Sequence, residues 1–140
     1  MQSLTTRSQW TMFIFGFLAF VLGVAGLVNH KNLLKQMGFD AIDEEDRAEH
    51  DYTPVFVTTS AMASTNMGIY YMLAAWFNVR QFFYWTVPFR MVTFVVFTTA
   101  VLQKRAPLKF ITVPIWELVG ALVTGWALWS ESKDTQSSPN

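Results

Sequence analysis

The sequence of 140 residues contains no cysteine. Disulfide staples, thiol nucleophiles and a CxxC redox centre are therefore excluded, whereas the absence says nothing about the compartment. Charge is also scarce, because charged residues make up 14% of the chain and the formal net charge is zero. With no large basic cluster, nucleic acid is not expected as a partner.

Apolar residues dominate what is left. They make up 52% of the chain, and aromatic residues 16%, which is too apolar for a soluble domain of this size. A membrane-spanning helix needs about 20 apolar residues, and four windows qualify: 10–28, 55–77, 82–102 and 110–129. The sequence predicts an all-α, integral membrane four-helix bundle. It forms one membrane domain over 1–140, with a polar loop at 30–53 and a disordered tail at 131–140.

The connections predict how the spans are arranged. Only the short segment Asn78–Gln81 separates the second and third windows, which predicts antiparallel neighbours. Of the Lys and Arg residues outside the windows, six lie in the other two loops and three elsewhere. The positive-inside rule then places both termini on the lumenal or outer side. We expect a multi-pass protein of the endoplasmic reticulum, surrounded by the lipid bilayer.

Two charges inside the windows need an explanation. Glu117 lies well within the fourth window and Arg90 within the third. An ionised group in hydrocarbon costs at least a few kcal/mol, so each side chain should face the protein interior and find a partner. At 1.5 Å rise per residue their depths are close enough for an extended Arg side chain to reach Glu117. We predict that the two residues form a pair.

The second window supplies polar neighbours for this pair. Asn66 and Tyr70 are four residues apart and share a helix face, and Tyr71 follows. A cluster of Glu117, Arg90, Asn66 and the tyrosines would combine a base, a fixed positive charge and neutral donors. The simpler alternative is a buried ion pair that only fixes helix register. Met62, Trp85 and Trp116 could line an apolar cavity beside the cluster, although such residues are also typical of a core.

The first loop carries seven carboxylates between Asp40 and Asp51. They lack the alternating oxygens and central glycine of an EF-hand, so no metal site is expected. His50 and Asp51 come just before the second window, where a substrate could enter from the membrane interface. The alternative is a plain polar linker.

The layout of these features resembles known families. Four short spans with an Arg in the third and an acid in the fourth resemble the DoxX-like group of small membrane proteins. The chain also resembles the small membrane epoxide hydrolases of fungal polyketide clusters, of the type implicated in aurovertin and citreoviridin formation. The segments that carry the likeness to the DoxX-like group are Leu33–Gly38, Asn66–Gly68, Pro88–Arg90 and Trp116–Gly120, whereas the likeness to the epoxide hydrolases rests on the size and layout of the chain. The implied activity is the opening of epoxides on an apolar polyene to give diols or cyclic ethers.

The residues are compatible with that activity. Epoxide opening needs a base, for which Glu117 is the candidate, and a donor to the opening oxygen, for which Tyr70, Tyr71 and Asn66 are candidates. Arg90 would keep Glu117 ionised, and no cofactor is expected. Two other functions stay open: a membrane isomerase of the sterol double-bond type, and a non-catalytic scaffold for biosynthetic membrane enzymes. Partners would be an apolar substrate and, in addition, a second copy of the chain or other such enzymes.

Overall fold

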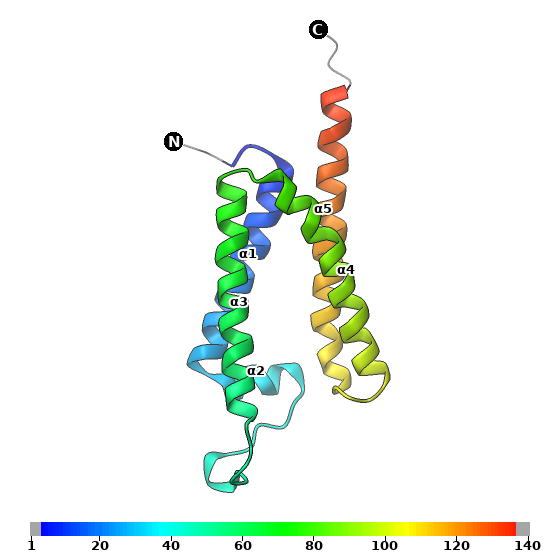
Figure 1. The fold of residues 1–140 in the computed structure, drawn as a ribbon. Helices are drawn as coiled ribbons and strands as arrows, with labels where there is room; N and C mark the ends of the chain where they lie inside the picture. The colour runs from blue at the N-terminus through cyan, green and yellow to red at the C-terminus, as the bar shows by residue number, and fades with distance from the viewer. Residues whose placement is uncertain (1–3, 137–140) are drawn as a thin grey trace.

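The computed structural model describes residues 4–136. Within that range the chain is all-α, as the composition predicts, and contains no β-strand. The long helices of the described residues are α1, α3, α4 and α5, which pack as two pairs. Figure 1 shows the pairs joined at one end and spread apart at the other. The elements in chain order are α1 (Arg7–Val28), α2 (His30–Met37), η1 (Glu44–Asp46), α3 (Thr53–Trp76), α4 (Arg80–Leu102), η2 (Leu108–Ile111) and α5 (Thr112–Gln136).

The first pair consists of α1 and α3, which pack along most of their length. Small residues at helical spacing make this possible, because they let two backbones approach closely. Gly16 and Gly68 lie at one point of close approach: a Cβ on Gly68 would lie 2.6 Å from the Gly16 carbonyl oxygen, and a Cβ on Gly16 would lie 2.7 Å from the Tyr71 Cβ. Neither position has room for a side chain.

The second pair consists of α4 and α5, with Pro88 inside α4. The turn between α3 and α4 is as short as expected and the two helices run in opposite directions, but they touch only near the turn and are not neighbours along their length. Asn78 adopts a left-handed conformation with φ 51°, and the chain turns away from α3. From there α4 runs down along α5 (Figure 1).

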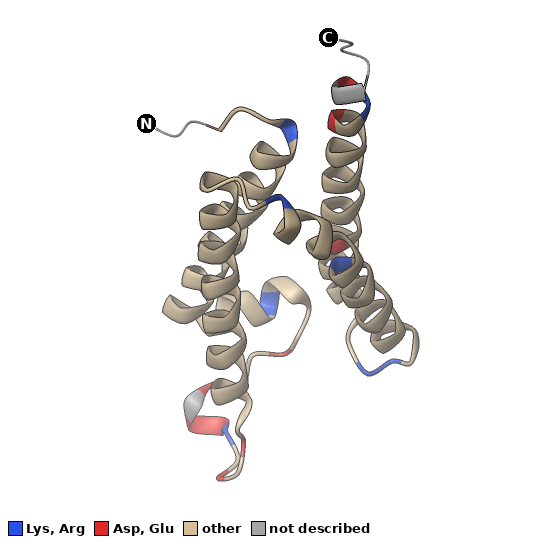
Figure 2. Cartoon of the chain, turned by 45° about the horizontal axis from the view of Figure 1, so that its top comes forward, with Lys and Arg blue, Asp and Glu red and all other residues tan. Residues whose placement is uncertain are grey.

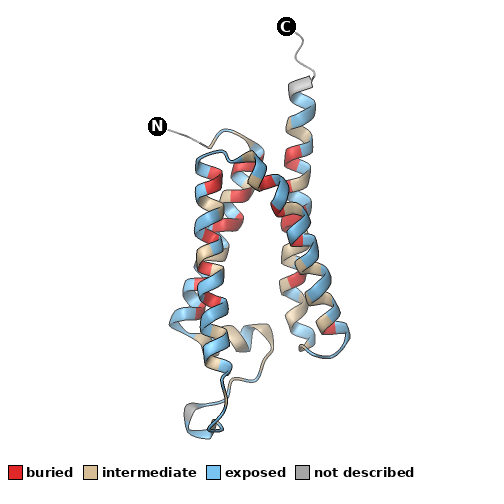
Figure 3. Ribbon diagram, in the orientation of Figure 1, coloured by how far each residue is buried: buried red, intermediate tan, exposed pale blue. Residues whose placement is uncertain are grey.

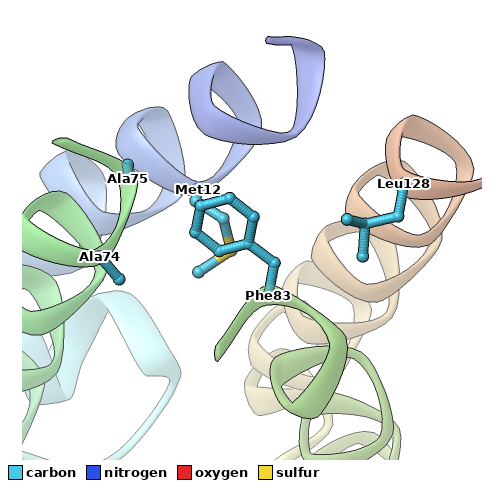
Figure 4. Packing of buried hydrophobic residues seen from close by; sticks show 5 residues of the cluster. All are labelled: Met12, Ala74, Ala75, Phe83 and Leu128. Atoms are coloured by element: carbon cyan, nitrogen blue, oxygen red, sulfur yellow. The ribbon is translucent and has the colours of Figure 1, made fainter. Parts of the chain in front are cut away.

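The two pairs meet at the end where α1 begins and α5 finishes, which we call the terminal end. A cluster of buried side chains joins α1, α3, α4 and α5 there: Met12, Ala74, Ala75, Phe83 and Leu128 (Figure 4). Glu131 adds polar contacts, because its carboxylate accepts hydrogen bonds from the Ser8 backbone N–H at 2.6 Å and the Ser8 hydroxyl at 3.0 Å. Arg80 Nη1 lies 2.9 Å from the Glu131 Oε2 atom.

These contacts correct one expectation. The prediction of a disordered tail over 131–140 is wrong for 131–136, because α5 continues to Gln136. The reason is that Glu131 is held by α1 and α4, so the last turns of α5 have partners from two other helices. Residues 137–140 lie outside the described part of the chain.

The opposite end, which we call the loop end, holds a helix where a polar loop was predicted. α2 begins after Asn29, whose side chain accepts from the Asn32 N–H, and ends at Gly38 with φ 86°. Past Gly38, the ring of Phe39 meets that of Phe110 in an edge contact at 5.7 Å. The chain thereby reaches across from the α1–α3 pair to the start of α5.

Within the described residues, three helices are long and apolar enough to cross a membrane: Arg7–Val28, Arg80–Leu102 and Leu108–Asp134. α3 has a similar length and no charged residue, but its Ser, Thr and Asn side chains lower its hydropathy. Exposed apolar side chains cover all four long helices, whereas buried ones are few (Figure 3). A surface of this kind is typical of helices that face lipid.

Candidate active site

A cavity of about 460 Å³ lies between the two helix pairs, toward the loop end. Its size is within the range of small-molecule sites, which is about 300–1,000 Å³. α1, α2, α3 and α5 all contribute to a lining that is mainly apolar, with hydroxyl and amide groups on its wall and one carboxylate. The lining residues are Ala19, Leu22, Gly23, Leu33, Gln36, Met37, Ser60, Ala61, Ser64, Thr112, Val113, Trp116 and Glu117.

Glu117 connects this cavity to the charge pair. Its side chain is 24% exposed, and its Oε2 atom lies 3.9 Å from the Nε atom of Arg90. The predicted pair therefore exists as an ion pair between α5 and α4, visible as the adjacent red and blue positions midway along these helices (Figure 2). At 3.9 Å the two atoms are too far apart for a direct hydrogen bond.

Arg90 is enclosed by all three other long helices. It is 4% exposed, and its guanidinium carbon lies 4.7 Å from the ring centre of Phe15 and 5.0 Å from that of Tyr71. Such cation–π contacts stabilise a cation out of water. Gly120, one turn above Glu117 on α5, provides the space, because a Cβ there would collide with Arg90 Nη1. The guanidinium thus lies where the two helix pairs meet.

The predicted donors are not placed alike. Tyr71 contacts Arg90 through its ring, whereas Tyr70 is 56% exposed and does not line the cavity. Asn66 is half-buried and is also absent from the cavity wall. Of the predicted binding residues, Trp116 lines the cavity and packs on Phe15, with ring centres 4.6 Å apart.

Met62 and Trp85 lie elsewhere. Both are exposed on the outside of the helix pairs and do not contribute to the cavity. Their positions follow from helix rotation, because each long helix is apolar all round and its sequence does not mark which side faces inward. Substrate-binding roles for these two residues gain no support from the geometry.

His50 and Asp51 lie in the first loop, away from the cavity. Asp51 accepts hydrogen bonds from the hydroxyl and backbone N–H of Thr53, and Arg47 Nε lies 3.4 Å from its Oδ2 atom. These bonds to Thr53, with Arg47 nearby, hold the pKa of Asp51 below its usual value. The carboxylate therefore fixes the start of α3, and His50 beside it is exposed.

Sequence reasoning missed Phe15, Gly120 and the α2 residues at this site. A signal for α2 is present, since Leu33, Leu34 and Met37 fall on one helical face while Lys31, Asn32 and Lys35 occupy the other. Phe15 has no comparable signal, because aromatic residues are spread along all four long helices. Gly120 could have been found only by knowing that Arg90 crosses α5 at that turn.

The arrangement offers one carboxylate at an apolar cavity, a buried cation behind it and hydroxyl groups on the opposite wall. Such a set can bind an apolar molecule and move a proton. Among the described residues, no group of three or more His, Cys, Asp or Glu side chains is placed to hold a metal ion.

No protein-family model matches the chain, and neither the curated proteins nor the solved structures contain a significant match to it.

Proposed function

We propose that this protein is a multi-pass membrane enzyme that opens epoxides of an apolar, polyene-type metabolite. The observation that supports the proposal is the position of Glu117, at the wall of an apolar cavity and next to a buried Arg90. The reaction type comes from the resemblance in the sequence, and the geometry supplies a base and a binding space for it.

The chemistry needs only one proton carrier. Glu117 takes a proton from a hydroxyl group, whose oxygen then forms a bond to an epoxide carbon while the carbon–oxygen bond of the ring breaks. The proton on Glu117 passes to the resulting alkoxide, so atoms and charge balance without a cofactor. Water as the nucleophile gives a diol, and an internal hydroxyl gives a cyclic ether. Arg90 stabilises the carboxylate form of Glu117 before the first proton transfer and again after the second.

The membrane location follows from the same surfaces. We propose four spans, with α3 as the fourth alongside the three sufficiently apolar helices. Because α1 begins and α5 ends at the same end of the structure, both termini then lie on one side of the membrane (Figure 1). An apolar substrate reaches the cavity through the bilayer, and the endoplasmic reticulum is the proposed compartment.

The test is turnover of an epoxy-polyene by Glu117→Gln, which keeps the shape of the side chain and removes the base. We expect a loss of about 10²–10⁴-fold in rate, with insertion and thermal stability close to those of the wild type. Glu49→Gln, in the exposed loop, is the matched control and should turn over normally. Unchanged turnover by Glu117→Gln would exclude Glu117 as the base. Turnover by neither the wild type nor the variant would favour the scaffold function.

One observation favours a second candidate, a double-bond isomerase. Trp116 lines the cavity next to Glu117 and packs on Phe15, so aromatic faces are available to stabilise a carbocation formed when an acid protonates an alkene. Water enriched in heavy oxygen distinguishes the two reactions. Isomerisation leaves an unlabelled alkene, whereas hydrolysis puts the label into a diol and cyclisation converts an epoxide into an unlabelled ether.

A further inference from the structure

The guanidinium of Arg90 is buried without enough acceptors. Its Nε and Nη1 atoms have no hydrogen-bond partner among the described residues, although the side chain is 4% exposed. The guanidinium carbon lies over the rings of Phe15 and Tyr71, but these ring contacts supply no oxygen or nitrogen acceptor for the Nε and Nη1 donors. A buried donor without an acceptor is destabilising, and more so when it is charged. This cost points to an acceptor that the chain itself does not supply.

The position of Glu117 defines what that acceptor could be. An oxygen about 2.8 Å from both Arg90 Nε and Glu117 Oε2 forms a normal hydrogen bond with each. Because Arg90 Nε and Glu117 Oε2 are 3.9 Å apart, the angle at this oxygen between the two atoms is about 90°. A hydroxyl oxygen can meet both partners at once, because it accepts from Arg90 and donates to Glu117. An ether oxygen can satisfy only Arg90.

We propose that Arg90 and Glu117 together form a binding site for one hydroxyl group of the ligand. Binding of the hydroxyl does not depend on the proposed function. Its catalytic role rests on that function: the bound hydroxyl is the nucleophile that Glu117 deprotonates. Arg90 is then a catalytic residue that holds the attacking oxygen, and it does more than keep the carboxylate ionised. The cavity beside Glu117 holds the apolar part of the ligand.

Binding can be measured without turnover. Tritiated dodecanol is bound to the wild-type protein in lipid nanodiscs by scintillation proximity and is displaced with unlabelled dodecanol or with dodecyl methyl ether. Both competitors have similar apolar chains, but only the alcohol can donate to Glu117. A hydrogen bond to a charged group is worth about 1.5–3 kcal/mol, so dodecanol should compete at least about tenfold better than the ether.

Gly120 offers a variant that removes the site without touching either charge. In Gly120→Ala the new Cβ collides with Arg90 Nη1 and displaces the guanidinium, so the preference for the alcohol over the ether should fall to about onefold. Gly125→Ala is the matched control on the same helix, because its Cβ meets only Val87, at 3.6 Å. That variant should keep the preference. If Gly120→Ala does not fold, the wild-type ratio decides alone.

Equal competition by alcohol and ether in the wild type would overturn the hydroxyl site, whether or not the protein turns over epoxides. The reverse result, a clear alcohol preference with no turnover of epoxides, would uphold the site and reject the proposed function. Turnover in water enriched in heavy oxygen tests the occupant a second time. An unlabelled cyclic ether agrees with an alcohol of the ligand at this site, whereas a labelled diol shows that water is the nucleophile and would overturn the assignment.

Discussion

At the terminal end, side chains from all four long helices meet, whereas at the loop end the two pairs separate around the cavity. Phe83 and Met12 are fully buried at the terminal end, and Glu131 bonds to α1 and α4. At the loop end the lining of the cavity includes exposed residues such as Ser60 and Leu22. Buried packing is therefore concentrated at the terminal end and the cavity lies toward the loop end, with Arg90 between them.

The largest effect on stability is expected at Arg90, between the two ends. Arg90→Met leaves Glu117 without its charged partner, and breaking a buried pair in this way costs about 3–5 kcal/mol. The double variant Arg90→Met with Glu117→Gln should recover part of this loss. The measurement is the free energy of unfolding in mixed detergent and SDS. Losses that simply add in the double variant would contradict an interaction between the two residues.

The next largest effect on stability is expected for a buried side chain of the terminal end, compared with an exposed one on the same helix. Phe83→Ala should lower the free energy of unfolding by about 3–4 kcal/mol, because it opens a cavity among Met12, Ala75 and Leu128. Phe89→Ala, on the same helix, is the control, since Phe89 is 69% exposed and its loss leaves no internal cavity. If Phe83→Ala and Phe89→Ala lost similar free energies in SDS-driven unfolding, the terminal end would not be what holds the two helix pairs together.

A smaller effect is expected from the polar contacts at the same end. Glu131→Gln removes the charge opposite Arg80 and weakens the bonds from Ser8. We expect a loss of about 1–2 kcal/mol in the same unfolding measurement. Glu45→Gln, in the exposed first loop, should have no effect. An unchanged free energy of unfolding in Glu131→Gln would show that the apolar cluster alone holds the two helix pairs together at this end.

The smallest effect on stability is expected at the loop end, together with a clear effect on binding. Met37→Ala shortens a side chain of the cavity floor and should change the free energy of unfolding by less than about 1 kcal/mol. Dodecanol binding should weaken about tenfold, because apolar contact with the ligand is lost. Met62→Ala is the control, since Met62 is exposed outside the cavity. Equal binding by the two variants would mean that dodecanol does not occupy this cavity.

The parts of this structure that were predictable are those that depend on helix length and on the cost of charge in an apolar surrounding. Four long helices follow from the hydrophobic windows, and the approach of Arg90 to Glu117 follows from their depth. Helix rotation was not predictable, because lipid and protein interior are both apolar and leave no amphipathic pattern. Tyr70, Met62 and Trp85 were therefore assigned to an interior that they do not face. The last turns of α5 were missed because their stability comes from Ser8 and Arg80, which are distant in sequence.

The close packing of Gly16 against Gly68 also has a consequence for biogenesis. α1 is synthesised first and is long and apolar enough to cross a membrane, a criterion that α3 does not reach. In the folded protein the small residues of α1 fit those of α3, and the Ser64 hydroxyl donates to the Ala19 carbonyl oxygen at 3.0 Å. In the four-span arrangement proposed above, we therefore expect the insertion of α3 to depend on α1.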